Sequence, residues 1–289
     1  MVYRLLAVNI DGTLLQDNGR LNKATKEAIE YTQEKGIYIC LVSGRHYPSV
    51  KKVAKALKVD SCLIAHQGAF VAKHLDKPIL LKRIQEDITY ELSRFLESFH
   101  CRICLAHEKF SVSNKMDLPD SLVGRTVWQR TNNRMFYAQY FVDSVSDYLE
   151  KEPISPPKME VIFQNTRDLE DAKKAIEGMY DEVAIIRTNQ DRFDIVPSGV
   201  SKLHGLMYLC ERIKVSLKEV VMIGSGIDDL PLLHNAGLGV AMGNAPDDVK
   251  AAADWITRSN QENGVSYVVK ELFRRQRPIR FLEKMDGLK

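Results

Sequence analysis

Short apolar runs that alternate with helical patterns in the first 65 residues constrain the fold of this chain more than any other feature. Each run is typical of a buried strand, and the runs cover residues 3–8, 37–42 and 61–65. Between them, residues 22–36 and 43–59 carry apolar residues near helical spacing, and Asn22 and Gly36 suit an N-cap and a helix stop. Strands that alternate with helices predict a parallel, doubly wound α/β sheet.

The middle of the chain changes character and predicts a second unit. Its candidate elements are helices at residues 85–99 and 167–179 and strands at residues 133–142 and 158–163. From about residue 192 the alternation of helix and strand returns. We therefore predict an α/β core formed by residues 1–82 and 189–289, interrupted by an inserted α+β domain at residues 83–188.

The charge balance favours small-molecule partners over nucleic acids or membranes. Against 38 Asp and Glu residues, 41 Lys and Arg residues give a formal net charge of only +3, so no strong long-range field is expected. No apolar run approaches the roughly 20 residues of a membrane span, and we recognise no signal peptide. We predict a cytoplasmic protein and leave its oligomeric state open. The basic segment at residues 273–289 is expected to be solvated or docked on the protein itself.

The cysteines indicate a reducing compartment. Five widely spaced cysteines, an odd number, argue against a disulfide framework. Cys101 and Cys104 have CxxC spacing, but a zinc site of this kind needs a second pair. The alternation in "HCRICLA" places Cys101, Ile103 and Leu105 on one face of a strand, so we predict a structural role for these thiols.

Polar residues follow the predicted strands of the core. In an open parallel sheet, ligands bind beyond the carboxyl ends of the strands. The segments at these ends are residues 9–13, 43–45, 66–68, 224–229 and 243–244. In addition, Lys202 opens a helix after "PSGVS". A lysine, hydroxyl groups and glycine-rich turns at helix starts together predict an anion site, most simply for phosphate.

Five motifs follow one another along the chain: "NIDGT", "SGR", "GVSK", "GSGIDD" and "MGNA". In sequence and order they resemble the motifs of the haloacid-dehalogenase superfamily, and within it those of the Cof-type phosphatases with a large, late-inserted cap. The resemblance covers essentially the whole chain. It implies a Rossmann-like core with a parallel sheet and an α+β cap. It also implies hydrolysis of small phosphorylated metabolites such as sugar phosphates, with Mg²⁺ as the cofactor.

The resemblance further implies a role for each matching residue. Asn9 stands at the position of the attacking carboxylate, and Asp11 matches the general acid. Ser43 and Lys202 match the groups that hold the phosphoryl oxygens. Other contacts to phosphate or substrate are implied for Gly12, Gly44, Arg45, Gln67 and Asn244. The resemblance also implies contacts to the metal ion at Asn9, Asp11, Ser225, Asp228 and Asp229.

Two departures from these motifs change the expected chemistry. A carboxamide has no ionised oxygen, so Asn9 should not form the covalent phospho-intermediate of the family. Ser225 stands in place of a metal-binding aspartate, and Mg²⁺ prefers charged oxygen ligands, so metal affinity should fall. We therefore predict weak or absent turnover. With two negative charges removed near Lys202, phosphate binding without a metal is still expected.

Two alternatives stay open at this point. In the first, Asp11 or Asp228 compensates for the missing carboxylates, and the protein is a working Mg²⁺-dependent sugar-phosphate phosphatase. In the second, the chain is a non-enzymatic regulatory or interaction protein whose ligand site is vestigial. Assays of phosphate release and of phosphate binding separate these alternatives from the main prediction.

Overall fold

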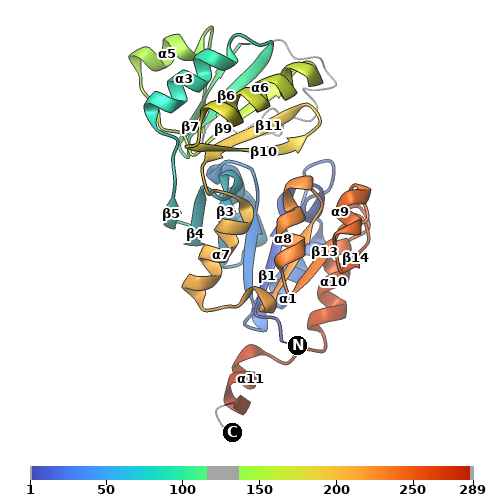
Figure 1. Ribbon diagram of the computed structural model, residues 1–289. Helices are drawn as coiled ribbons and strands as arrows, with labels where there is room; N and C mark the ends of the chain where they lie inside the picture. Colours follow the sequence, from blue (N-terminus) through green and yellow to red (C-terminus); the bar gives the residue numbers. More distant parts are fainter. Residues whose placement is uncertain (1, 116–136, 287–289) are drawn as a thin grey trace. The chain divides into compact units, whose positions relative to one another are not determined.

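The computed structural model describes residues 2–115 and 137–286, and Figure 1 labels its helices and strands. The chain divides into two compact units, which we call the core unit and the inserted unit. The core unit contains Met1–Arg45, Ser49–Leu80 and Ser201–Lys289, and the inserted unit contains His46–Pro48 and Leu81–Val200. Each unit has its own sheet and its own hydrophobic core.

The core unit is built on a sheet whose strand order, within the described residues, is β14-β13-β12-β1-β2-β3-β4-β5. Its strands are β1 Leu5–Asn9, β2 Tyr38–Val42, β3 Ser61–Ala65, β4 Phe70–His74, β5 Lys77–Leu81, β12 Val220–Gly224, β13 Leu238–Ala241 and β14 Trp255–Ile256. All neighbours from β14 to β3 pair in parallel, and β4 pairs antiparallel to β3. The predicted parallel α/β sheet is confirmed.

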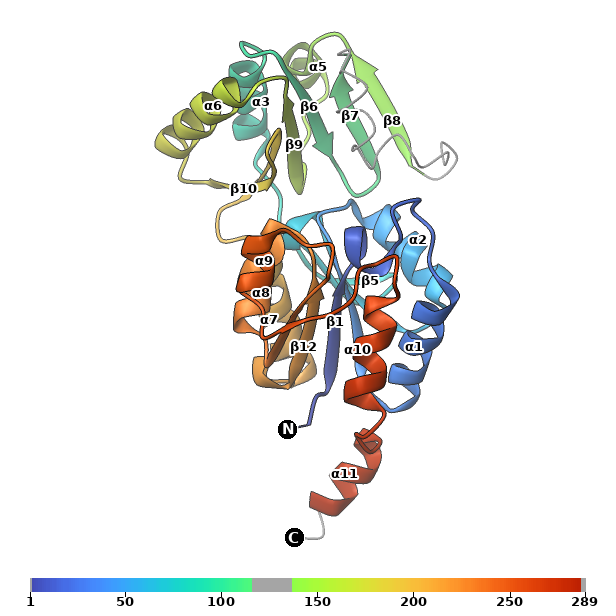
Figure 2. The same ribbon diagram turned by 90° about the vertical axis from the view of Figure 1, so that its right-hand side faces the viewer.

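Helices lie on both sides of the core sheet, as Figure 2 shows. They are α1 Lys23–Glu34, α2 Tyr47–Leu57, α7 Lys202–Ile213, α8 Leu230–Asn235, α9 Asp247–Ala251, α10 Gly264–Phe273 and α11 Ile279–Asp286, with short helical turns η1 Ile10–Leu14, η2 His66–Gly68, η3 Leu217–Glu219 and η4 Ile227–Asp229. The side chain of Asn22 accepts a hydrogen bond from Ala24 N, so the predicted N-cap of α1 is confirmed. Because both faces of the sheet are covered, every residue of β1 is buried.

The inserted unit has a sheet of order β10-β11-β9-β6-β7-β8 within the described residues. Its elements are β6 Cys101–Ala106, β7 Phe110–Asn114, β8 Ala138–Val142, β9 Lys158–Phe163, β10 Val183–Asn189 and β11 Arg192–Pro197, with helices α3 Glu86–Leu96, α5 Val145–Lys151 and α6 Thr166–Met179. The pair β7–β8 is parallel, and the other described pairs are antiparallel. Leu92 of α3 and Leu169 of α6 share one hydrophobic core with Val161 and Phe193 of the sheet.

One expected limit of the inserted domain is wrong. The sequence pattern assigns residues 189–200 to the core, but β11 pairs with β9 and β10 and so belongs to the sheet of the inserted unit. A local pattern identifies a strand, whereas the sheet that it joins depends on partners distant in sequence. The predicted strand at 133–142 includes β8, and residues 133–136 lie outside the described residues.

The cysteines occupy structural positions in both units. Cys101, Ile103 and Leu105 point into the core of the inserted unit, which confirms the predicted strand face. All five cysteines are free and buried, and burial raises the pKa of Cys62 and Cys104 to about 12. These thiols therefore stay uncharged near neutral pH, which suits apolar packing and not metal binding or nucleophilic chemistry.

The basic C-terminal segment docks on the core unit through backbone contacts. Ile279 is buried, and its N–H donates to the carbonyl of Lys35 at 2.9 Å. The Lys35 ammonium in turn donates to the carbonyl of Phe273, the last residue of α10, and to that of Gln276, which follows the helix. The side chain of Gln276 also accepts a hydrogen bond from Tyr3 N. None of the helices in the described part of the chain has the length and apolar composition that a membrane span requires.

Candidate functional site

The predicted site residues meet at the carboxyl end of the core sheet. The strands β12, β1, β2 and β3 are neighbours in the sheet, and their carboxyl ends carry Ser225, Asn9, Ser43 and Gln67 respectively. The fifth polar position is Lys202, the first residue of α7, which packs against β3 and β4. Parallel pairing thus brings segments more than 200 residues apart into hydrogen-bond contact, for instance Asn9 with Asp229 (220 residues apart).

Asn9 is buried at the end of β1, and both ends of its carboxamide are engaged. Its Oδ1 accepts a hydrogen bond from Ile10 N at 2.7 Å. Its Nδ2 donates to Asp229 Oδ2 at 2.5 Å. The side chain is therefore held in one orientation, with the neutral amide placed as a donor toward a carboxylate. An aspartate could not make this second contact, because two carboxylates would face each other.

Asp229 is the centre of the hydrogen-bond network, and its side chain is fully buried. Its Oδ2 accepts from Asn9 Nδ2 and from the backbone N–H groups of Ser225 and Gly226, the latter two at 3.0 Å. Its Oδ1 accepts from Lys202 Nζ at 2.7 Å. Four donors, one of them an ammonium, compensate the burial of this charge.

Lys202 lies between two carboxylates. Its ammonium is 2.8 Å from Asp228 Oδ2 and 2.7 Å from Asp229 Oδ1, and its side chain is only 3% exposed. Burial on its own lowers the pKa of Lys202, but Asp228 and Asp229 outweigh burial and hold this pKa above its ordinary value. Lys202 is consequently a permanent cation whose charge is already matched by its neighbours.

Gln67 reaches the same cluster from a strained turn. His66 and Gln67 both have left-handed backbone angles, with φ of +49° and +57°. Such angles are uncommon outside glycine and persist where the surrounding structure holds them. The turn directs Gln67 Nε2 to Asp228 Oδ2 at 3.1 Å. The absence of a side chain at Gly44 makes room for Gln67, because a Cβ there would lie 2.6 Å from Nε2.

Ser225 links the loop after β12 to the turn after β1. Its hydroxyl donates to the carbonyl of Asp11 at 3.0 Å and accepts from Thr13 Oγ1 at 2.9 Å. Gly12 lies beside it with φ of +66°, and a Cβ at this position would come within 2.9 Å of Ser225 Oγ. Thr13 thus has a role that the "NIDGT" motif, to which it belongs, did not predict.

Asp11 is held away from the Asn9 cluster by an arginine. Arg45 donates from Nε to Asp11 Oδ2 at 2.7 Å and from Nη2 to Asp11 Oδ1 at 2.5 Å, a bidentate pair. Arg45 is itself positioned, since its Nη1 donates to Ser49 Oγ at 3.2 Å and its backbone N–H donates to Ser43 Oγ. Ser43 is buried, and its hydroxyl thus caps the turn that carries the arginine.

Asn244 closes the site from the loop after β13. Its Nδ2 donates to the carbonyl of Gly12 at 2.8 Å, and its Oδ1 accepts from Asn260 N at 3.0 Å. Asn260 then binds the carbonyl of Leu15 and the carboxylate of Asp17. The predicted Asn244 therefore supports the first turn by binding its backbone. Asn260 was missed, because no motif in the sequence connects it to a segment so distant along the chain.

The donor set at this site does not fit Mg²⁺. The cation requires oxygen ligands, usually including carboxylates. The Asp229 carboxylate is saturated by four donors, Asp11 is paired with Arg45, and the Lys202 ammonium already pairs with both Asp228 and Asp229. Among the described residues, no group of three or more His, Cys, Asp and Glu side chains could hold a metal ion. These contacts do not favour the metal site that the resemblance implies at Asn9, Asp11, Ser225, Asp228 and Asp229.

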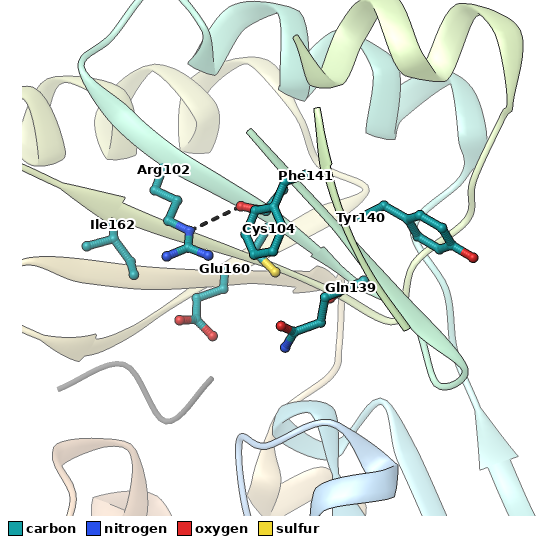
Figure 3. Close-up of a pocket in the computed structure, with 9 residues that line it drawn as sticks. Arg102, Cys104, Gln139, Tyr140, Phe141, Glu160 and Ile162 are labelled. Carbon is teal, nitrogen blue, oxygen red and sulfur yellow. Dashed lines mark hydrogen bonds between the residues drawn. The ribbon is translucent and has the colours of Figure 1, made fainter. Parts of the chain in front are cut away.

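A shallow hollow lies on the sheet face of the inserted unit. Figure 3 shows Arg102, Gln139 and Glu160 extending to this face of the sheet, with Phe141 beside the guanidinium. Arg102 Nε donates to Ser113 Oγ at 3.1 Å. The enclosed space is only about 10 Å³, so it has room for about one water molecule and not for a metabolite.

A family model for haloacid dehalogenase-like hydrolases matches residues 6–269. The chain belongs to this family. It is 46% identical over 284 residues to the stress response protein YhaX of Bacillus subtilis (strain 168), covering 98% of each chain. It is 24% identical over 277 residues to the 5-amino-6-(5-phospho-D-ribitylamino)uracil phosphatase YcsE of the same organism, covering 92% of this chain and 94% of the relative.

Solved structures agree with this membership at the level of the fold. A haloacid dehalogenase-like hydrolase from B. subtilis superposes with a TM-score of 0.82 at 22% identity, covering 93% of this chain and 99% of that one. The HAD subclass IIB sugar phosphatase BT4131 gives a TM-score of 0.77 at 22% identity, with the same coverage. The predicted resemblance to Cof-type members of the haloacid-dehalogenase superfamily and the predicted fold class are confirmed.

Proposed function

We propose that this haloacid-dehalogenase family member binds small phosphorylated metabolites at the carboxyl end of its core sheet and hydrolyses them slowly or not at all. The observation that carries the proposal is the Asn9 carboxamide, which is fixed by Ile10 N and Asp229 at the position where the family has its attacking carboxylate. A carboxamide nitrogen that donates to a carboxylate has no free electron pair with which to attack phosphorus.

The contacts of Asp11 support the same conclusion. A general acid must present a protonated oxygen to the leaving group. Both carboxylate oxygens of Asp11 instead accept hydrogen bonds from Arg45, so neither oxygen is presented to a leaving group in this arrangement. Because nucleophile and acid act as a unit, loss of the first is not offset by retention of the second.

Phosphate binding would use the groups that the site presents as donors. Ser43 supplies a hydroxyl, the turns at Gly12 and Gly44 supply backbone N–H groups, and Lys202 supplies a positive charge. A phosphate dianion must compete with Asp228 for the ammonium, since Asp228 is the less buried of the two carboxylates that pair with it. We therefore expect weak, metal-independent binding.

Asp228→Asn provides a sharp test of this arrangement. The substitution keeps the side-chain shape and removes one negative charge 2.8 Å from Lys202 Nζ. Calorimetric titration with inorganic phosphate should give an affinity about tenfold higher than that of the wild type, which corresponds to about 1.4 kcal/mol. Asp247→Asn, a change at a fully exposed aspartate, is the matched control and should leave the affinity unchanged. Equal affinities in all three proteins would exclude Lys202 from the phosphate site.

A phosphate-release screen over sugar phosphates with Mg²⁺ tests the absence of turnover. We expect no release above that of a boiled control. Release that disappears in Asp11→Ala would overturn the proposal in favour of a working phosphatase in which Asp11 or Asp228 compensates. Restoration by Asn9→Asp together with Ser225→Asp should produce activity if only these two carboxylates separate this chain from catalytic relatives.

A regulatory role is the second candidate, and the 46% identity to a protein named for stress response favours it. In this case the sheet-edge site would bind no ligand. Calorimetry with phosphate and sugar phosphates that detects no heat, with and without Mg²⁺, would support this candidate against the first. For either function we propose a cytoplasmic location, which is supported by the five free cysteines.

A further inference from the structure

In the described residues, hydrogen bonds join the turn after β1 to the loop after β12. Three donors contribute: the Ser225 hydroxyl binds the carbonyl of Asp11, the Thr13 hydroxyl binds Ser225 Oγ, and the Asn9 amide binds Asp229. We infer that this junction replaces a divalent cation as the link between the two loops, and that Asn9 and Ser225 form a matched pair that makes the folded core independent of Mg²⁺.

The first half of the junction is the contact of Ser225. Its hydroxyl hydrogen lies between two oxygens, Ser225 Oγ and Asp11 O, that are 3.0 Å apart. The Thr13 hydroxyl donates to the same Oγ, so the serine oxygen has one donor and one acceptor. A carboxylate at residue 225 has no hydrogen to give to the Asp11 carbonyl. It would place negative charge against that oxygen unless a cation came between them.

The second half is the contact of Asn9. An aspartate at residue 9 would bring a carboxylate oxygen to about the 2.5 Å that now separates Asn9 Nδ2 from Asp229 Oδ2. Lys202 cannot compensate this charge as well, because it already pairs with Asp228 and Asp229. Two like charges at this separation repel strongly in a buried site. The amide removes the repulsion and supplies a hydrogen bond in its place.

The two residues are coupled because either one, changed alone to aspartate, leaves an uncompensated charge. In the double variant, the new carboxylates at residues 9 and 225 join the Asp229 carboxylate and the Asp11 carbonyl around one space. Such a set of oxygens is what Mg²⁺ prefers. The inference does not depend on whether the protein binds phosphate, because it concerns only the stability of the core and the binding of the metal ion.

The experiment compares thermal unfolding in EDTA and in excess MgCl₂ for the wild type, Asn9→Asp, Ser225→Asp and the double variant. The wild-type Tm should change by less than about 1 °C between the two conditions. Each variant should unfold at least about 5 °C lower in EDTA, and Mg²⁺ should raise the Tm of the double variant by a similar amount. Ser225→Ala is the control: it removes the hydroxyl without adding charge, so its Tm should fall equally in both conditions.

Calorimetric titration of the wild type with MgCl₂ alone decides the inference even if the double variant does not fold. No heat of binding is expected. A binding isotherm for the wild type, together with a higher Tm in MgCl₂, would overturn the inference. The inference would also be overturned if, in MgCl₂, the double variant lost as much Tm relative to the wild type as the two single variants lose together. Such additivity would mean that residues 9 and 225 act independently.

Discussion

The charge balance around Lys202 allows a prediction that tests the centre of the site. Lys202→Met keeps most of the side-chain volume but leaves the fully buried Asp229 carboxylate without its ammonium, which lies 2.7 Å away in the wild type. Breaking a buried ion pair by removing one partner costs about 3–5 kcal/mol. Because Asp229 retains three N–H donors, we expect the lower end, a loss of about 3 kcal/mol in the free energy of unfolding.

The dependence of this loss on pH follows from the direction in which the pKa of Lys202 shifts on folding. Burial lowers the pKa of Lys202, but its two carboxylate neighbours raise it by more, so the pKa is higher in the folded state than in the unfolded state. The stabilisation is therefore fully present below about pH 10 and is lost only as the pH rises through the folded pKa. Lys202→Met lacks this ammonium at every pH, so its loss relative to the wild type should become smaller as the pH rises above about 10.

Urea unfolding at neutral pH and above about pH 10, followed by tryptophan fluorescence, measures both effects. The matched control is Lys26→Met, which removes a lysine 3.9 Å from Glu30 on the surface of α1 and should change the free energy of unfolding by about 0.5 kcal/mol or less. If Lys202→Met were no more harmful than Lys26→Met at neutral pH, or if its loss grew as the pH rose above about 10, the buried cluster would not be charged as we have described it.

Four further predictions concern other parts of the fold. Gly68→Ala should lower the free energy of unfolding by at least about 3 kcal/mol, because its φ is +101° and a Cβ would lie 2.1 Å from Ser201 O. Gly178→Ala, in α6 with open space around it, should instead raise it by about 0.5–1 kcal/mol in the same urea titration. Lys158→Met removes a buried ammonium 2.9 Å from an aspartate in the inserted unit and should cost about 3 kcal/mol. The buried Cys62 thiol, whose pKa burial raises to about 12, should react with an aromatic disulfide reagent at pH near 8 only after denaturant is added.

Much of the core could be predicted from sequence because its determinants are local. An apolar run such as 5–8 can be buried on both faces only in a covered parallel sheet, and the side chain of Asn22 caps the helix that it precedes. The assignment of β11 failed for the opposite reason. A local pattern can indicate a strand at β11. Its pairing with β9 and β10 depends on tertiary packing, which a local pattern does not predict.

The site shows the same division between position and contact. The carboxyl ends of parallel strands meet at one edge, so the sequence could predict that Asn9, Gln67 and Asp229 lie together. It could not predict which donor meets which acceptor. The pairing of Asp11 with Arg45 and the contact of Gln67 with Asp228 depend on side-chain orientation and on a left-handed turn that sequence does not reveal.

These contacts also change the argument about charge that follows from the sequence. Loss of carboxylates at residues 9 and 225 was expected to leave Lys202 freer to attract an anion. In the structure Asp228 and Asp229 both pair with the ammonium, so the cluster of these three groups carries a net charge of −1, obtained from one positive and two negative charges. The neutral residues therefore do not create an open cationic pocket. They allow a lysine and two aspartates to satisfy one another without a metal, and an anion can use Lys202 only by displacing Asp228.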